Sequence, residues 1–397
     1  MSYENVPKNL TQQAVLTRGG RPDYLKLAAD PFPSPAVDEA GAILEETDTG
    51  DRYRWTSTVW VQTYTAGAVN TVSPVSATLD YYMEVAKGNV AGTSKVHKYG
   101  RNPDIDIASG FEAIWDGGGT YTGHDCIVAE TLETYSSSAL DVGTLVSSGT
   151  ATGGTATTLV DTGATFVSDG VVVGDLLLDD THLDHAILTG VTETTLTFRL
   201  MHLLNEATVG DAYRVVTQAS TGSAVVKLGF LLDNDFANET SEFIILNGTT
   251  PVDTVGTYLR HSRGKTYLGT NAGDITTRQK TTTANVTMIL PIGYNSTMTA
   301  AYTIPAGKRA FIVDWFAAVA KKSTVSAEIK LLTTPVGGNK QVSEELALVS
   351  VGSGYINRKY TIPKDAIKPM TDIVIEAEVD TNNSGIAAGF DLVLIDI

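Results

Sequence analysis

The sequence has 397 residues, with 45 acidic and 28 basic side chains and a formal net charge of −17. A chain this acidic repels the phosphate backbone of nucleic acid unless a local basic patch overrides the overall field. Basic residues gather only at 18–21, 95–101 and 260–265, with two or three positive charges in each group. We interpret these groups as solvated loop charges and exclude nucleic acid as a partner.

The composition favours strands and turns, because glycine is abundant at 37 residues and charged residues make up only 18% of the chain. The single cysteine, Cys126, can form no disulfide within the chain and cannot alone complete a thiolate metal site. The longest apolar stretch, residues 310–320, is short and contains Asp314, and the first residues lack the apolar core of a secretion signal. We therefore expect a mainly β protein that is made in a cytoplasm and does not insert into a membrane.

The first predicted segment, residues 1–45, contains scattered prolines and no sustained periodicity, which is typical of an extended arm that lies on a neighbouring subunit. Residues 46–143 are predicted to form a β-rich domain with one helix at 79–90, ending near Gly88. A short meander at its start carries Tyr53, Trp55 and Trp60. These rings are interpreted as anchors of a small core, with a sugar-stacking surface as the alternative.

The second half is predicted to be built from β modules. Residues 144–216 contain about five short strands separated by Gly and Asp turns, and their flanks look like one connection opened to admit an inserted module. Residues 217–280 are predicted to continue the N-terminal β domain. Residues 281–397 contain eight strand candidates, which indicates a C-terminal β-sandwich of jelly-roll type. The tetrapeptide YTIP, at 302–305 and 360–363, is expected to close two edge strands.

The loop of residues 100–123 is the first candidate site. Asp104, Asp106 and Glu112 suggest a calcium loop, but the spacing lacks the Gly and Glu that an EF-hand requires, so a solvated acidic loop is favoured. The triple glycine at 117–119 and the Gly-Lys-Thr at 264–266 both lack the context of a phosphate-binding loop. Residues 111, 114 and 115 are apolar and are predicted to form one short helical turn.

The second candidate site is the densest group of potential metal ligands: Asp179, Asp180, His182, Asp184 and His185. We expect these residues in a turn between two strands, where neighbouring side chains point to opposite faces and do not converge. Signatures of serine, zinc and Cys/His hydrolases are missing from the sequence, although the two carboxylates that a glycosidase needs stay open. The prediction is therefore a non-enzymatic chain without catalytic, cofactor-binding or metal-binding residues.

Four stretches of the sequence, among them "ILEETDTGDRYRWTSTVWVQ" and "GRNPDIDIASGFEAIWDGGGTYTG", resemble virion structural proteins of tailed bacteriophages. The resemblance extends from about residue 41 to the C-terminus, and the module at 144–216 is its main departure. It implies an external decoration or fibre protein of the head, neck or tail, located on the virion. It also implies a homotrimer that contacts other virion proteins through the N-terminal arm, and no catalytic residue.

Two further functions stay open at this point. The chain could be a receptor-binding fibre whose C-terminal sandwich or inserted module recognises host-surface glycan, which exposed Tyr and Trp side chains would favour. A glycan-cleaving spike is the third alternative, although the sequence lacks the solenoid period of such enzymes.

Overall fold

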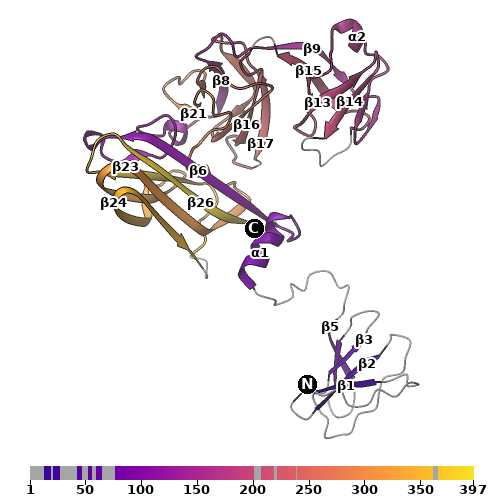
Figure 1. Cartoon of the computed structure of the whole chain (residues 1–397), viewed down its shortest axis with the longest axis vertical. Helices are drawn as coiled ribbons and strands as arrows, with labels where there is room; N and C mark the ends of the chain where they lie inside the picture. Colours follow the sequence, from indigo (N-terminus) through magenta and orange to yellow (C-terminus); the bar gives the residue numbers. More distant parts are fainter. Residues whose placement is uncertain are drawn as a thin grey trace. The chain divides into compact units, whose positions relative to one another are not determined.

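The computed structural model confirms a mainly β fold (Figure 1). The chain divides into two compact units, Met1–Ala77 and Thr78–Ile397, which are considered separately. The structure describes residues 13–18, 21–26, 43–46, 52–55, 60–64, 77–200, 207–218, 221–237, 239–360 and 365–397.

The N-terminal unit contains a five-stranded sheet in the order β1-β2-β3-β4-β5. The expectation of an extended arm over residues 1–45 is therefore wrong for the described part of that range, which is paired in a sheet. Only β2 and β3 pair in parallel, and the other neighbours are antiparallel. The strands are β1 (Gln13–Arg18), β2 (Arg21–Lys26), β3 (Ile43–Glu46), β4 (Arg52–Trp55) and β5 (Trp60–Tyr64).

The predicted helix is α1 (Ala77–Ala86), which ends before Gly88 as the sequence indicates. Its residue Val85 is buried against Val313 and Val393 of the C-terminal sandwich. Gly88 has a φ of 75°, a backbone conformation that glycine adopts without strain and that commonly follows a helix end.

Residues 143–218 form a seven-stranded antiparallel sheet, in the order β10-β11-β14-β13-β12-β15-β9, which we call the inserted module. Its own core includes Phe166, Leu188 and Val215, each fully buried. The predicted module at 144–216 corresponds to this sheet. Its elements are β9 (Gly143–Thr150), β10 (Gly153–Thr155), β11 (Thr158–Val160), α2 (Phe166–Asp169), β12 (Leu176–Asp179), β13 (Asp184–Val191), β14 (Thr195–Leu200) and β15 (Ala212–Gln218).

The two Gly-Asp pairs of this module make the same turn twice. Gly174 and Gly210 have φ values of 101° and 100°, and strands β12 and β15 begin two residues later. Asp175 and Asp211 each accept the backbone N–H of the residue three positions earlier, at 2.9 and 2.7 Å. The carboxylates therefore close turns, which is a common role of Asp in loops.

A middle sandwich adjoins the module, with a three-stranded sheet (β17-β16-β19) and a four-stranded sheet (β18-β8-β20-β21). Its core contains Leu132, Leu228 and Met288. The predicted boundary at residue 281 is wrong, because β21 pairs with β20 in this sandwich. The strands are β8 (Glu130–Ser136), β16 (Val225–Leu231), β17 (Thr240–Ile245), β18 (Val252–Tyr258), β19 (Arg263–Tyr267), β20 (Ile275–Gln279) and β21 (Val286–Leu290).

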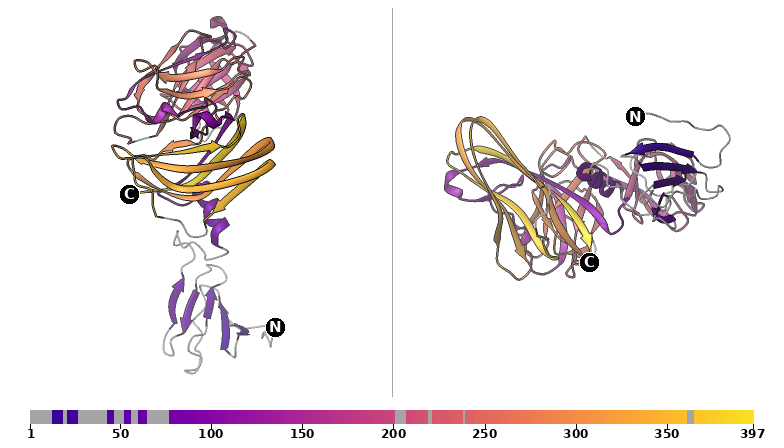
Figure 2. Two further views of the ribbon diagram at one scale, coloured as in Figure 1. Left: turned by 90° about the vertical axis from the view of Figure 1, so that its left-hand side faces the viewer. Right: turned by 90° about the horizontal axis from the view of Figure 1, so that it is seen from below.

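The C-terminal sandwich is built around two very long strands, β23 (Lys308–Pro335) and β24 (Gln341–Lys359). The first half of β23 pairs with β26 and the second half with β25, while β24 follows β23 through both halves. Four of the eight strands predicted for residues 281–397 are thus halves of two long strands, β23 and β24. Figure 2 shows these strands side by side in orange and yellow. The other strands are β6 (Thr93–Ile105), β7 (Glu112–Ala113), β22 (Ala301–Thr303), β25 (Thr371–Val379) and β26 (Ser384–Asp396).

Strand β6 belongs to this sandwich because it pairs with β26 along almost its whole length. The assignment of residues 93–105 to an N-terminal domain is therefore wrong. The first YTIP sequence closes β22, an edge strand as predicted. The second follows the end of β24, and its residues 361–363 lie outside the described residues.

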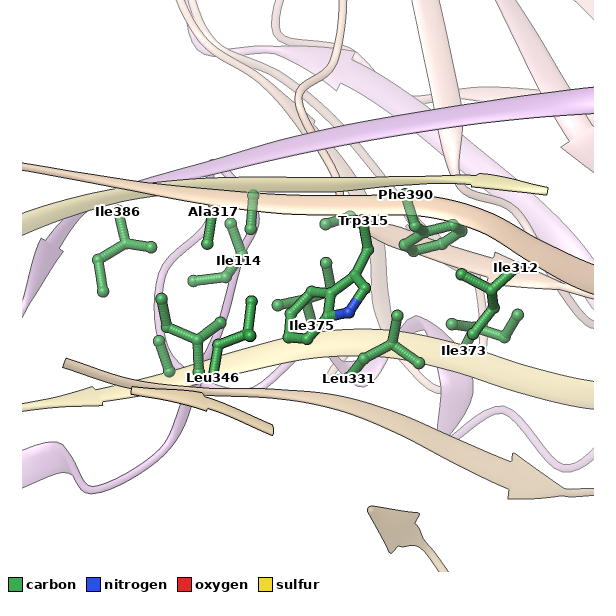
Figure 3. Close-up of a cluster of buried hydrophobic side chains, with 14 of the residues drawn as sticks. Ile114, Ile312, Trp315, Ala317, Leu331, Leu346, Ile373, Ile375, Ile386 and Phe390 are labelled. Atoms are coloured by element: carbon green, nitrogen blue, oxygen red, sulfur yellow. The ribbon is translucent and has the colours of Figure 1, made fainter. Parts of the chain in front are cut away.

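The core of the C-terminal sandwich follows the two-residue period of its strands. Along β26, every second side chain from Ile386 to Leu394 is buried. Trp315 is fully buried at the centre and extends from β23 toward Leu331 and Ile375 of the opposite layer (Figure 3). Apolar burial of this extent is the main source of the free energy of folding.

Candidate functional site

The acidic loop of residues 100–123 uses its carboxylates as structural hydrogen-bond acceptors. Glu112 is buried and accepts the backbone N–H of Gly119 at 2.8 Å and the side-chain amide of Asn102 at 3.0 Å. Asp106 accepts the backbone N–H of Asn383 at 2.9 Å, and Asp104 is exposed. Glu112 and Asp106 therefore contact separate partners, and the three carboxylates are not among the side chains that converge as a metal-ligand group.

The apolar residues of this loop do not form the predicted helical turn. Residues 112 and 113 form strand β7, which pairs with β25, and the helical residues of the loop are in two 3-10 turns, Ile107–Ser109 and Thr122–His124. Trp115 is buried, meets Tyr121 edge to face at 5.2 Å, and donates its indole N–H to the carbonyl of Gly118 at 2.8 Å. Gly118 itself has a φ of 64°, so the glycine run provides the turn that Trp115 caps.

The second candidate site does bring metal-ligand types together, though not in the predicted set. Among the described residues, His, Cys, Asp and Glu side chains converge in this way only at Asp179, His182 and Asp211, whose ligand atoms lie within 4.8 Å of one another. Asp211 comes from the turn before β15 and is far away in the sequence. The repeated Gly-Asp pair was the sequence signal that could have brought Asp211 into the predicted group, because the two turns precede the neighbouring strands β12 and β15.

Hydrogen bonds within the two turns account for the convergence of Asp179, His182 and Asp211. Nδ1 of His182 lies 2.9 Å from Asp179, and this hydrogen bond raises the pKa of His182 despite some burial. Asp179 also accepts the backbone N–H groups of residues 181 and 182, at 2.9 and 3.0 Å. Asp211 accepts both the backbone N–H and the hydroxyl of Thr208. The group is an ion-paired turn.

The other members of the predicted group lie apart from it. Asp180 forms a bidentate ion pair with Arg214, with both distances at 2.7 Å. His185 is buried beside Tyr267, with ring centroids 4.0 Å apart. Asp184 and His185 instead contribute to the wall of a cleft between the inserted module and the middle sandwich.

This cleft, of about 400 Å³, has one face of the sheet β17-β16-β19 as its floor. The registers of the two strand pairs give three rows of side chains across that face. Because residues directly opposite each other on neighbouring strands share a face, each row can be read off the pairing. The rows are Ile245–Val225–Tyr267, Phe243–Lys227–Lys265 and Ser241–Gly229–Arg263.

The inserted module covers only the apolar end of this face. Leu176 and Leu178 of β12 pack against Val225 and Phe243, which leaves the second and third rows open as the cleft. At the centre of the third row, Gly229 presents only backbone. A Cβ placed there would meet nothing closer than 3.7 Å, so internal packing does not require the glycine.

Positive charge is concentrated in the cleft. Lys227, Lys265 and Arg263 lie on neighbouring positions, and none of them forms a salt bridge within the described part of the chain. Each lies instead over an aromatic ring: Phe243, Tyr267 and Phe230, at 5.1 to 5.6 Å. Burial lowers the pKa of Lys227, and repulsion from Arg263 and Lys265 contributes to that shift, although Asp184 opposes it.

A second cleft of about 260 Å³ shares Phe230 and Arg263 with the first. Its wall includes Tyr99 and the buried Lys98, whose pKa is lowered to about 7 by burial and by repulsion from Arg263. Phe230 lies at a bulge of β16 and has a φ of 56°, in the left-handed region. Strained backbone of this kind at a bulky residue is often found at binding sites.

Two of the three basic groups that the sequence analysis interprets as solvated loop charges lie on strands instead. Lys98 lies on β6, and Arg263 and Lys265 lie on β19, so two of the three groups meet at Arg263, which lines both clefts. The Gly-Lys-Thr sequence at 264–266 is part of β19, where Lys265 faces the cleft. Alternation of charge along β19 was the available signal, since residues 263, 265 and 267 share one face.

The remaining sequence predictions have limited structural counterparts. Trp55 pairs with Trp60 across β4 and β5, and their side chains lie outside the described residues. Cys126 is buried, and burial raises the pKa of its thiol to about 11. Among the described residues, no helix has the length and apolar character needed to cross a membrane. Comparison of the sequence with known protein families and with curated proteins finds no match.

Proposed function

We propose that this protein is a non-enzymatic structural component of a tailed-phage virion, an external decoration or fibre protein of the head, neck or tail that assembles as a homotrimer. The resemblance of four sequence stretches to such proteins supports the virion assignment. The β architecture, with an inserted module and a large C-terminal sandwich, is compatible with it. The N-terminal unit, in place of the expected arm, contacts other virion proteins.

The observation that carries the assembly part is the edge of the C-terminal sandwich. Strand β24 has 19 residues and, among the described residues, pairs only with β23. Along it, Val342, Val349 and Tyr355 are 53%, 71% and 64% exposed. A long edge strand with exposed apolar side chains associates readily with another chain, and oligomer formation is one way to cover it.

The proposal is tested by the mass of the full-length protein in light scattering, together with Val349→Lys. The expected result is a trimer for the natural chain and a smaller species for the variant, since a charge on a paired or packed edge opposes association. Val209→Lys is the matched control, because Val209 is also exposed, at 75%, but lies in a turn of the module. A monomeric natural chain would overturn the assembly proposal.

The virion part has a separate test. Antibody raised against the purified protein should label intact phage particles in electron microscopy, at the head, neck or tail. Absence of label on particles that are produced in the same infection as the protein would contradict the assignment.

A second candidate function is a receptor-binding fibre module that recognises host-surface glycan. The observation that favours it is the cleft beside Lys227, Arg263 and Lys265, which combines charge with ring faces.

A further inference from the structure

We infer that the cleft between the inserted module and the middle sandwich binds an anionic saccharide, through Lys227, Arg263 and Lys265 for its acidic group and through the rings of Tyr267 and Phe230 for its sugar faces. The inference deepens the receptor-binding candidate and does not depend on assembly through β24.

The arrangement of charge is the first argument. Lys227 and Lys265 are directly opposite each other on β16 and β19, and Arg263 is the next residue on the same face of β19. Like charges in such positions destabilise a sheet unless something compensates for them. The whole chain has a net charge of −17, so a cluster of three cations is opposite in sign to the overall field of the protein. Asp184 and Glu239 compensate for part of this charge, and a bound anion would add to that compensation.

The three cations of the cleft form no salt bridge with the part of the chain that the structure describes. Arg263 and Lys265 are both exposed and form no salt bridge with any described residue. Lys227 donates a hydrogen bond to the carbonyl of Leu183, which fixes its ammonium at the module side of the cleft. Ammonium and guanidinium groups held in this way are ready donors for carboxylate or phosphate oxygens.

The third argument distinguishes a sugar from a bare polyanion. Two carboxylates, Asp184 and Glu239, line the same cleft, and Ser241 adds a hydroxyl. They would repel a continuous phosphate backbone, whereas the hydroxyl groups of a saccharide can donate hydrogen bonds to them. Tyr267 and Phe230 are both partly exposed, although His185, Lys265 and Arg263 lie against their rings. The exposed part of each ring provides apolar surface that the C–H groups of a sugar can cover.

The shape of the cleft is the fourth argument. Its volume, about 400 Å³, lies within the range of small-molecule sites. Gly229 leaves space above the sheet at the floor of the cleft, although a Cβ would fit there without a clash. The second cleft, which continues past Phe230 and Arg263 to Tyr99, extends the site beyond one sugar unit. A short oligosaccharide therefore suits the site better than a monosaccharide.

The test is isothermal titration calorimetry on the full-length protein. The probes are trigalacturonate, neutral maltotriose, galacturonate, glucose 6-phosphate, inorganic phosphate and single-stranded oligothymidylate. We expect trigalacturonate to bind more tightly than galacturonate and maltotriose to bind much more weakly. The two charged monosaccharides show whether the site prefers carboxylate or phosphate.

Two kinds of variant locate the site. Arg263→Met and Lys265→Met should each lower the affinity for trigalacturonate by roughly tenfold or more, the loss expected for a hydrogen bond to a charged group. Gly229→Leu should block binding by filling the floor, while circular dichroism and Tm show that the fold is kept. Lys280→Met removes an exposed charge from the opposite sheet of the middle sandwich and should leave binding unchanged.

Each other outcome would overturn part or all of the inference. Equal binding of maltotriose rejects the need for an anionic group, and equal binding of phosphate or oligothymidylate rejects the need for a sugar. Unchanged affinity in the cleft variants rejects the location, and no binding by any acidic sugar rejects the inference as a whole. Because the cleft variants should keep the natural oligomeric mass, failure here is distinguishable from failure of the assembly proposal.

Discussion

Arg260 and Asp372 form a buried, bidentate ion pair between the middle sandwich and the C-terminal sandwich. Their two hydrogen bonds are 3.0 and 2.9 Å long, and both side chains are at most 7% exposed. The guanidinium also donates to the carbonyl of Cys126 at 2.7 Å, and Thr303 donates its hydroxyl to Asp372. The donors and acceptors at this junction thus satisfy one another.

Removing one partner of this pair should be strongly destabilising. Asp372→Asn leaves the Arg260 charge buried without its counter-ion, and we expect a loss of about 3–5 kcal/mol in the free energy of unfolding. Chemical denaturation followed by tryptophan fluorescence measures it. The exposed pair Lys280–Asp253 is the control, because solvent screens its charges and Asp253→Asn should cost far less than Asp372→Asn. Equal losses in the two variants would contradict this interpretation.

Trp115→Ala should destabilise the loop that connects β6 with the middle sandwich. The indole is 4% exposed and packs on Tyr121, so truncation should cost about 3–5 kcal/mol. Trp115→Phe keeps most of the apolar contact and loses the hydrogen bond to Gly118, and should cost less. Thermal unfolding of both variants measures the difference. An unchanged Tm in Trp115→Ala would show that the buried position is dispensable.

The stability of the protein should fall as the pH decreases from 6.5 to 4. Burial lowers the pKa of His261 and of His124 to about 4, so in this window the unfolded chain takes up protons that the folded chain does not. Asp116 acts in the opposite direction, because burial raises its pKa to about 6 and the folded state is then the one that binds the proton. Burial also raises the pKa values of Glu239 and Asp314, which act with Asp116. The pKa values of Asp372 and Glu112 are lowered by their hydrogen-bond and ion-pair partners despite burial, so these groups act with the two histidines, and we expect a net loss of stability.

Urea denaturation at pH 7, 6 and 5 checks this dependence. The neutral His261 donates from Nε2 to the carbonyl of Arg263 at 2.7 Å, which leaves Nδ1 as the acceptor for Thr287. His261→Gln, which cannot titrate, should be less stable at pH 7 but lose less on acidification. His97→Gln, at an exposed side chain, is the control for a simple loss of imidazole. A parallel pH profile in His261→Gln and the natural protein would contradict the assignment.

Metal ions should not change the stability of the module. The oxygens of Asp179 and Asp211 already accept hydrogen bonds from their own turns and from His182, so a cation would have to displace these contacts. We expect the same Tm with EDTA and with added zinc or calcium. Asp211→Asn should lower the Tm equally in all three conditions. A metal-dependent rise in Tm that disappears in Asp211→Asn would show that the cluster is a metal site.

The parts of the fold that depend on neighbouring residues could be predicted from the sequence. Alternation of apolar and polar residues located nearly every strand of the second half, and the helix was found from its periodicity. The inserted module was visible from its short strands separated by Gly and Asp turns, and the structure shows that its flanks, near residues 143 and 217, pair with each other. Each of these signals lies within a short window of sequence.

The parts that depend on distant pairing could not be predicted. The sequence predicts four separate strands where the structure has only β23 and β24. In the structure the β23–β24 ladder continues on both sides of a register shift between Ala320 and Thr324. The cleft has the same origin: Lys227 and Lys265 are neighbours only because β16 and β19 pair. Counting charges along the chain could not reveal a cluster formed across strands.

The pairing of β6 with β26 has a consequence for biosynthesis. Thr93 lies opposite Ile395, so the C-terminal sandwich cannot close until strand β26 has been made. The middle sandwich and the inserted module lie between these partners in the sequence and can fold earlier, while β6 waits unpaired. Contacts this distant in sequence slow folding and prolong the lifetime of aggregation-prone intermediates. A chain that stops before β26 would therefore carry a folded inserted module and middle sandwich next to a C-terminal sandwich that never forms.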